Sequence, residues 1–149
     1  MSTTELLVEI LDCAFDRQSW HGPNLMSSLR GVRAKDAARS LPGRKSIWQQ
    51  FLHAAYWKHR VLNKIIGTSP FPRRGSNWPK LPDERNEKRF KADIEMLRRE
   101  HQQLRQAIAS LSENQLTPKQ IWRIHGAAAH DLYHAGQIKL LRRFSSSRK

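Results

Sequence analysis

Two histidines four residues apart are the clearest sign of chemistry in this sequence. His130 and His134 lie in a segment with helical character, and a spacing of four places both imidazoles on one helix face, one turn apart. Such a pair can bind one metal ion. The residues between them are Asp-Leu-Tyr, and no glutamate follows the first histidine, which excludes a thermolysin-like zinc peptidase. The spacing alone is a weak signal, because short motifs also arise by chance.

A third histidine, His53, lies on a different segment with helical periodicity. At 100° per residue its row also contains Gln49, Trp57 and Arg60, and the opposite face contains Phe51, Ala55 and Leu62. His130 and His134 share a row with Arg123 and Gln137, opposite Ala128 and Leu132. None of the three histidines therefore belongs to a main apolar stripe. They either face solvent or line a polar cleft between two helices, and the wheel by itself favours solvent.

Two further reactive side chains fit the core better than a site. His101 interrupts a regular apolar seam, which we interpret as a hydrogen-bonded core histidine in preference to a pocket residue or metal ligand. Cys13 is the single cysteine, so no intramolecular disulfide can form. It falls on an apolar stripe, and we interpret it as a small core residue and not as a reactive thiol.

The elements that must position these residues are helices. Ser2, Thr3 or Thr4 caps a first helix, for which the sequence predicts a buried stripe of Leu6, Ile10, Cys13 and Ala14. Residues 21–23 break that helix, and residues 24–41 indicate one or two short helices. A long helix is predicted from the cap Ser46 to the stop at Gly67. Residues 68–82 contain four prolines and indicate a loop.

Two more long helices complete the prediction. The third, from about Asp83 to Leu111, has apolar positions spaced alternately by four and three residues. These positions are Phe90, Ile94, Leu97, His101, Leu104, Ile108 and Leu111. Thr117 and Pro118 open the fourth helix, which extends to about Phe144 and leaves residues 145–149 as a frayed tail. The fold class predicted is all-α: a single domain over residues 1–149, a four-helix bundle with an additional short helical segment between helices 1 and 2.

Charge and composition limit the other classes of function. The chain has 149 residues and a net charge of +14, which would attract nucleic acid or acidic small molecules. No helix-turn-helix signature or aromatic stacking platform accompanies that charge. No apolar run approaches the roughly 18 residues of a membrane span, and the first sixteen residues lack the basic start of a secretory signal. We therefore expect a cytoplasmic protein with no membrane partner.

The sequence resembles the DinB/YfiT superfamily of metal-binding four-helix bundles, named for the damage-inducible DinB family. The resemblance is carried by Ser46-Ile-Trp-Gln-Gln-Phe-Leu-His53 and by His130-Asp-Leu-Tyr-His134-Ala-Gly-Gln137-Ile. It extends to residues 20–23, 29–32 and 42–48. It implies that His53, His130 and His134 hold a divalent metal, Zn²⁺ or Ni²⁺. The polar faces of the two helices would then line a cleft that contains the metal.

The resemblance also implies a class of activity. Some members are similar to thiol S-transferases that use a low-molecular-weight thiol, and others to metal-dependent hydrolases. One type of member has a glutamate ligand where this sequence has His130. Three imidazoles leave an open coordination position, which is typical of a catalytic site. Members commonly form homodimers, and five tryptophans in a small domain are compatible with an interface.

Four expectations follow for the site and its function. Gln137 is one turn from His134 and is a candidate to orient it, whereas Asp131 faces a neighbouring helix or solvent. Trp57 and Tyr56 either wall the pocket or serve in packing or on the surface, the second being favoured. We expect a metal-dependent enzyme acting on a small-molecule substrate, with thiol S-transfer ahead of hydrolysis. The alternatives are a non-catalytic metal-binding protein and a basic module that binds nucleic acid or anions.

Overall fold

Four long helices form the body of the molecule in the computed structural model, which describes residues 1–146. They are α1 (Thr3–Phe15), α4 (Ile47–Ile66), α5 (Glu87–Ala109) and α6 (Pro118–Ser146). Two short helices, α2 (Leu25–Leu29) and α3 (Ala34–Ala37), lie between α1 and α4, and a 3₁₀ turn, η1 (Glu113–Gln115), precedes α6. The predicted all-α bundle with a short helical segment between its first two long helices is confirmed.

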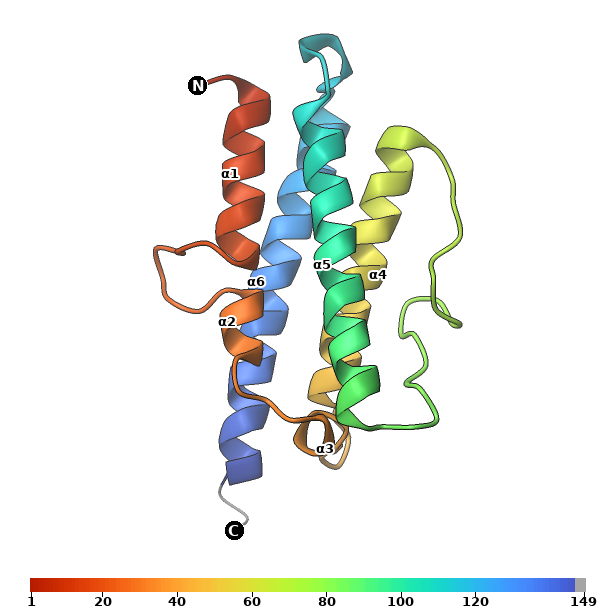
Figure 1. Cartoon of the computed structure of the whole chain (residues 1–149). Coiled ribbons are helices and arrows are strands. Elements are labelled where there is room, and N and C mark those ends of the chain that lie inside the picture. The colour runs from red at the N-terminus through yellow and green to blue at the C-terminus, as the bar shows by residue number, and fades with distance from the viewer. Residues whose placement is uncertain (147–149) are drawn as a thin grey trace.

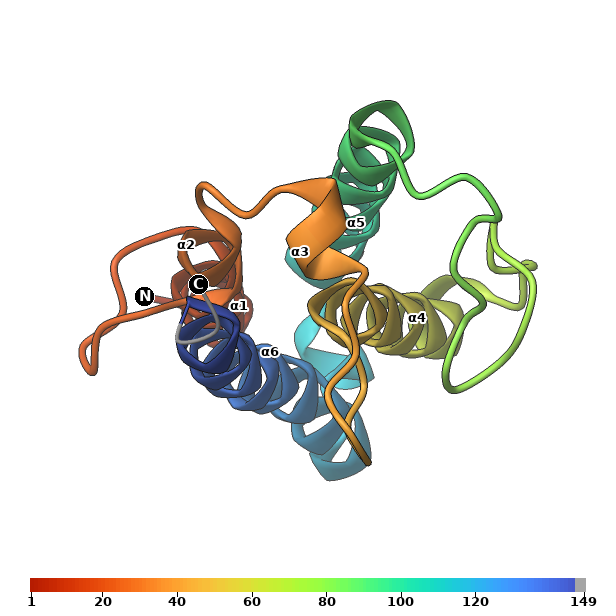
Figure 2. The ribbon, with the colours of Figure 1, turned by 90° about the horizontal axis from the view of Figure 1, so that it is seen from below.

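The long helices pack in the cyclic order α1, α6, α4, α5. Each contacts its two neighbours in that order, and α2 continues the line of α1 along α6 (Figure 1). Viewed from below, α3 crosses the ends of α4 and α5, and the long α4–α5 connection loops outward beside α4 (Figure 2). Among the residues described, every helix is too short or too polar to serve as a bilayer span.

Local signals set the helix boundaries. The Ser46 hydroxyl accepts a hydrogen bond from the Gln49 amide, and the Gln49 side chain accepts one from the Ser46 amide, so a capping box begins α4. α4 ends at Gly67, whose φ of +102° is a conformation that favours glycine. Both predicted ends of α4 are confirmed. Asn86 caps α5, which begins at Glu87, a few residues later than the sequence predicted.

A polar layer divides the apolar core into two clusters. One cluster is built around Trp48, Phe51 and Leu97, and the other around Leu11, Leu104 and Ile124. Among their buried polar residues, each long helix contributes one to this layer: Asp12, Lys58, His101 and Asp131. These side chains pair with one another across the bundle, as buried polar groups generally must, although Asp131 Oδ1 has no protein partner.

Hydrogen bonds connect this layer. Lys58 Nζ lies 2.5 Å from Asp131 Oδ2 and 3.3 Å from His101 Nδ1. His101 Nε2 lies 3.1 Å from Asp12 Oδ1, and the Phe15 ring stacks on the imidazole at 3.8 Å. The interpretation of His101 as a satisfied core histidine is confirmed. Burial, and then the nearby Lys58 charge, lowers the pKa of His101 to about 3.

The predicted buried stripe of α1 is confirmed at Ala14 only, and the interpretation of Cys13 as a core residue is wrong. On α1, Leu6 and Ile10 are 47% and 37% exposed, and Cys13 is half-buried. The buried face of α1 is instead formed by Leu7, Val8, Leu11, Ala14 and Phe15. The stripe was assigned to the core because apolar periodicity shows that a helix has an apolar side, but not what covers it.

The C-terminal boundary of the last helix also differs from the prediction. α6 continues to Ser146, and the Ser145 hydroxyl donates a hydrogen bond to the Leu141 carbonyl. Residues 145 and 146 are therefore helical and not part of a frayed tail. The rest of the predicted tail, residues 147–149, lies outside the described residues.

Candidate metal centre

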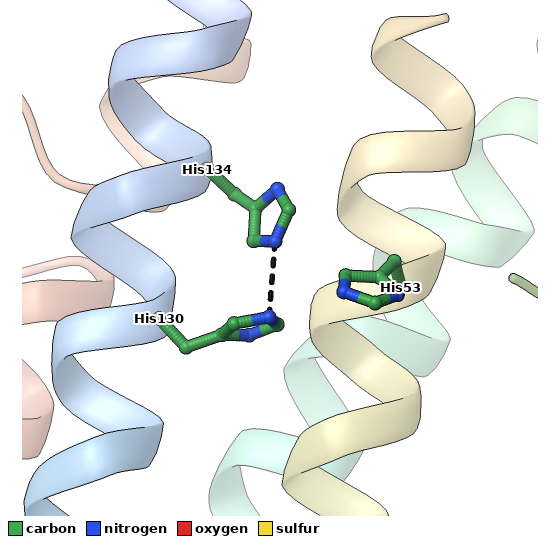
Figure 3. A group of neighbouring side chains, drawn as sticks. All are labelled: His53, His130 and His134. Carbon is green, nitrogen blue, oxygen red and sulfur yellow. Dashed lines mark hydrogen bonds between the residues drawn. The ribbon is translucent and has the colours of Figure 1, made fainter. Parts of the chain in front are cut away.

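Three imidazoles from two neighbouring helices converge on one point. His53 comes from α4, and His130 and His134 come from consecutive turns of α6 (Figure 3). One nitrogen from each ring lies within 4.8 Å of the other two, and the Nε2 atoms of His130 and His134 are 3.0 Å apart. Three nitrogens in this arrangement could hold a single divalent metal ion. The polar rows of α4 and α6 therefore face each other, and the solvent interpretation of the wheels is wrong.

Acceptors on the far side of two rings fix their orientation. His134 Nδ1 donates to Gln50 Oε1 at 2.5 Å, and His53 Nδ1 donates to the main-chain carbonyl of Asn77. With Nδ1 protonated, each ring keeps the lone pair of Nε2 for a metal. Gln137 was the sequence candidate for orienting His134, but the acceptor is Gln50 on the opposite helix.

The α4–α5 connection covers one side of the centre. Trp78 stacks on His53 with ring centroids 3.9 Å apart, and the Asn77 side chain accepts a hydrogen bond from Trp57 Nε1 at 2.8 Å. Sequence analysis assigned this segment only as a loop. The signal that could have found these residues is the pair of adjacent polar and aromatic side chains, Asn77-Trp78, among the prolines.

Buried anchors hold that connection against the bundle. Arg73 pairs with Asp93, whose other oxygen accepts from Trp48 Nε1 at 2.8 Å. Nearer α4, His59 Nδ1 lies 3.0 Å from Glu100 Oε2, and its Nε2 lies 2.9 Å from the Ser69 carbonyl. His59 is thus a structural histidine that joins α4, α5 and the loop, and it lies outside the candidate centre.

The environment keeps the three imidazoles neutral. Burial lowers the pKa of His134 to about 3 and that of His130 to about 4, and in both cases the neighbouring site histidines add to the effect. Burial also lowers the pKa of His53, although the hydrogen bond to Asn77 opposes this. Neutral imidazole is the form that binds a metal, so protons compete weakly for this site at pH 7.

Aromatic side chains form the exposed rim. Trp57 is 40% exposed, with its ring 6.4 Å from those of both His53 and His130. Tyr133 is 62% exposed and contacts the His134 ring edge-on at 5.1 Å. Tyr56 packs on Phe71, which is the packing role that sequence analysis favoured for it. Asp131 points away from the centre and into the polar layer, where it pairs with Lys58 of α4. Of the two predicted surroundings, a neighbouring helix or solvent, it faces the neighbouring helix.

Replacing Gln50 should weaken metal binding more than replacing Gln137. Gln50→Met keeps the side-chain volume but removes the acceptor for His134 Nδ1, and losses of such acceptors cost about 10–100-fold in metal affinity. Gln137→Met, the matched control on α6, should change affinity less than about 3-fold, since point changes away from such contacts have small effects. Competition with a chromophoric chelator would measure both. Equal losses in the two variants would contradict the assignment of Gln50.

Comparison with known proteins gives one match. A sequence model of the DinB superfamily matches residues 25–138, which include all three site histidines. No curated protein and no solved structure matches the chain significantly.

Proposed function

This chain belongs to the DinB superfamily, and from that premise we propose that it is a metal-dependent enzyme of the thiol S-transferase type. His53, His130 and His134 are the proposed ligands of one Zn²⁺ or Ni²⁺ ion. The observation that carries the proposal is the convergence of three neutral, buried or half-buried imidazole nitrogens on one point. We also assign the protein to the cytoplasm, in keeping with its single cysteine.

The chemistry follows from the donor set. A divalent ion held by three protein ligands keeps an open position and lowers the pKa of a thiol or water placed there. The protein's own contribution is to orient the rings through Gln50 and Asn77 and to exclude water with Trp78. In the overall reaction, a thiol RSH and an electrophile R′X give RSR′ and HX. Hydrolysis would use the same position, with water in place of the thiol.

Metal analysis and a transfer assay test the proposal together. We expect about one Zn²⁺ or Ni²⁺ per purified chain, and metal-dependent transfer when a panel of small thiols is screened against an aryl halide. His130→Ala should lose stoichiometric metal and activity while remaining helical by circular dichroism. Full metal content in the triple His→Ala variant of residues 53, 130 and 134 would place the metal elsewhere. Metal without activity toward any thiol or ester would favour a non-catalytic metal-binding protein.

The basic charge offers the competing function of nucleic-acid binding. If the +14 charge is incidental, DNA binding should be weak and should vanish as salt rises to physiological levels, because it depends on counterion release. Removing basic residues from the C-terminal segment 142–149 should weaken that binding and leave the metal content unchanged. His134→Ala should lower the metal content and leave DNA binding unchanged. Tight, salt-resistant DNA binding by the wild type would favour the nucleic-acid function instead.

A further inference from the structure

A pocket of about 360 Å³ adjoins the candidate metal centre, between the chain that enters α4 and the connection that follows it. Its walls come from the segment after α3, the first turn of α4 and the end of the α4–α5 connection. We call it the basic pocket. Its main lining residues are Lys45, Gln49, Trp78, Pro79, Lys80 and Arg85. A cavity of this size suits a small molecule and not a nucleic-acid duplex.

The charged side chains that line the basic pocket are all cationic. They are those of Lys45, Lys80 and Arg85, and all three residues are exposed. Within residues 1–146, none of the three forms an ion pair with a carboxylate. By contrast, the less exposed cations Lys58 and Arg73 each have an aspartate partner. Like charges that share a pocket repel one another, so an anion placed among them relieves that repulsion.

Gln49 adds a neutral hydrogen-bond donor to the same wall. Its Oε1 already accepts a hydrogen bond from the Ser46 amide at 2.9 Å, in the capping box of α4. The group that remains is the side-chain NH₂, which only donates. Apart from the Ser40 hydroxyl, the polar side chains of the basic pocket therefore offer only donors. Such a set favours a charged acceptor, a carboxylate or a phosphate.

The loop that supplies Trp78 and Lys80 is held in shape by its own backbone. The Lys80 amide donates a hydrogen bond to the Arg74 carbonyl at 3.1 Å, which closes the loop. Gly75 has a φ of +100°, and a Cβ at this position would lie 3.1 Å from the Cα of Pro79. Both the conformation and the close contact therefore require glycine. This wall of the pocket is formed by the protein alone, so a ligand need not order it on binding.

Trp78 joins the basic pocket to the metal centre. Its ring stacks on His53 with centroids 3.9 Å apart, and Lys45 Nζ lies over the Trp78 ring at 5.2 Å from its centroid. Trp78 also faces His134 edge-on, with ring centroids 6.3 Å apart. One indole therefore lies between the pocket and two of the three proposed metal ligands.

We propose that Lys45, Lys80 and Arg85 bind an anionic group of the molecule whose reacting atom lies at the metal centre. The assignment to a substrate rests on the proposed function, whereas binding of an anion to the pocket needs no metal. The anionic group is a carboxylate or a phosphate, since both accept hydrogen bonds from these donors. The substrates are thus narrowed to small molecules that carry an acid group as well as a thiol. Holding that acid group would also orient the thiol.

Calorimetric titration of the full-length, metal-free protein tests the pocket by itself. At low salt we expect succinate or inorganic phosphate to bind with a Kd of about 1 mM or lower, and neutral succinamide not to bind. The pocket variant, Lys45→Gln with Lys80→Gln and Arg85→Gln, should bind the same acid about 30-fold or more weakly, because charge-assisted contacts supply most of the affinity. Comparison of succinate with phosphate identifies the preferred acid group. Failure of both acids to bind would overturn the proposal.

A second triple variant separates the pocket from the net charge. Lys88→Gln with Lys91→Gln and Arg99→Gln removes the same amount of charge from exposed positions of α5. It should keep the affinity for the acid within about 2-fold of wild type, because distant exposed charges are screened. Both variants should match the wild type in circular dichroism and metal content. Equal losses of acid binding in the two variants would reduce the effect to net charge, and displacement of the acid by a short DNA duplex would assign the cations to nucleic acid. Either result would overturn the proposal.

Thiol binding to the Co²⁺-loaded protein tests the link between the pocket and the metal. Mercaptosuccinate and 2-mercaptoethanol offer a thiol with and without carboxylates, and absorption by the Co²⁺ site reports thiol binding without any turnover. The wild type should bind mercaptosuccinate about 10-fold or more tightly than 2-mercaptoethanol, and the pocket variant should lose that preference. A preference that survives in the pocket variant would overturn the role as a substrate subsite. A protein that takes up no Co²⁺ would overturn the proposed function, whereas calorimetry would still show whether the pocket binds acids.

Discussion

Metal-free protein is expected to lose about 4–5 kcal/mol of unfolding free energy when the pH falls from 7 to 5. The cause is the set of buried imidazoles at residues 101, 130 and 134, whose folded pKa values are about 3, 4 and 3 against a normal value of 6.5. Below pH 6.5 the unfolded chain takes up protons that the folded chain does not. Each of the three contributes a loss of roughly 2 kcal/mol at pH 5.

One buried carboxyl acts in the opposite direction. Burial raises the pKa of Asp131 from 3.8 to about 6, although Lys58 partly offsets this. Between these two values the folded state binds the proton more readily than the unfolded state, so Asp131 regains about 1 kcal/mol by pH 5. The histidines outweigh it, and stability should fall as the pH falls.

Urea unfolding of the metal-free protein at pH 7, 6 and 5, followed by circular dichroism, would measure this change. His101→Leu should flatten the pH dependence by the contribution of one proton. Saturating Zn²⁺ should protect the folded state at pH 6, since metal binds only the neutral rings. A stability that is constant from pH 7 to pH 5 would contradict the buried, neutral state of these histidines.

Replacing Lys58 by alanine should cost about 3–5 kcal/mol of unfolding free energy at pH 7. Lys58 is 1% exposed, and its Nζ is the partner of both Asp131 and His101. Its removal would leave the Asp131 carboxylate buried, with Oδ2 unpaired beside an Oδ1 that already has no protein partner. It would also open a cavity at the centre of the bundle.

Removing both charges is the control for that variant. Lys58→Met combined with Asp131→Val replaces the ion pair by apolar groups of similar volume, which is often neutral or stabilising. His101 Nδ1 still loses its donor in the double variant, so we expect most, but not all, of the stability to return. Urea midpoints of Lys58→Met, Asp131→Val and the double variant would complete a double-mutant cycle. A Lys58→Ala protein within about 1 kcal/mol of wild type would show that the pair contributes little.

The helices and their capping residues could be predicted from sequence because their signals are local. Ser46 and Gly67 mark the ends of α4 through interactions within one turn, and the alternating seam of α5 is a property of that helix alone. The position of His101 in the seam also predicted its role, because a histidine with apolar neighbours in the core must find hydrogen-bond partners. Its partners, Asp12 and Lys58, come from other helices and had no sequence signal.

The candidate metal centre could be predicted only by resemblance. A helical wheel cannot show that His53 and His130 face each other, because that depends on how α4 and α6 pack. The hydrogen-bond acceptors that orient the histidines were harder still to predict. Asn77 acts through its main-chain carbonyl, which carries no side-chain signal, and Gln50 was hidden by an equally plausible glutamine at position 137.

The concentration of features on α6 has a consequence for synthesis on the ribosome. Residues 118–146 supply two of the three proposed metal ligands and one of the four long helices of the bundle. Chains emerge from the N-terminus at about 5–20 residues per second, so α1, α4 and α5 wait for their last neighbour with the core open. We expect metal insertion to wait until α6 has been synthesised and can pack against α4. A nonsense mutation or proteolytic cut before α6 would therefore release a fragment with an uncovered core, which is a substrate for chaperones and degradation.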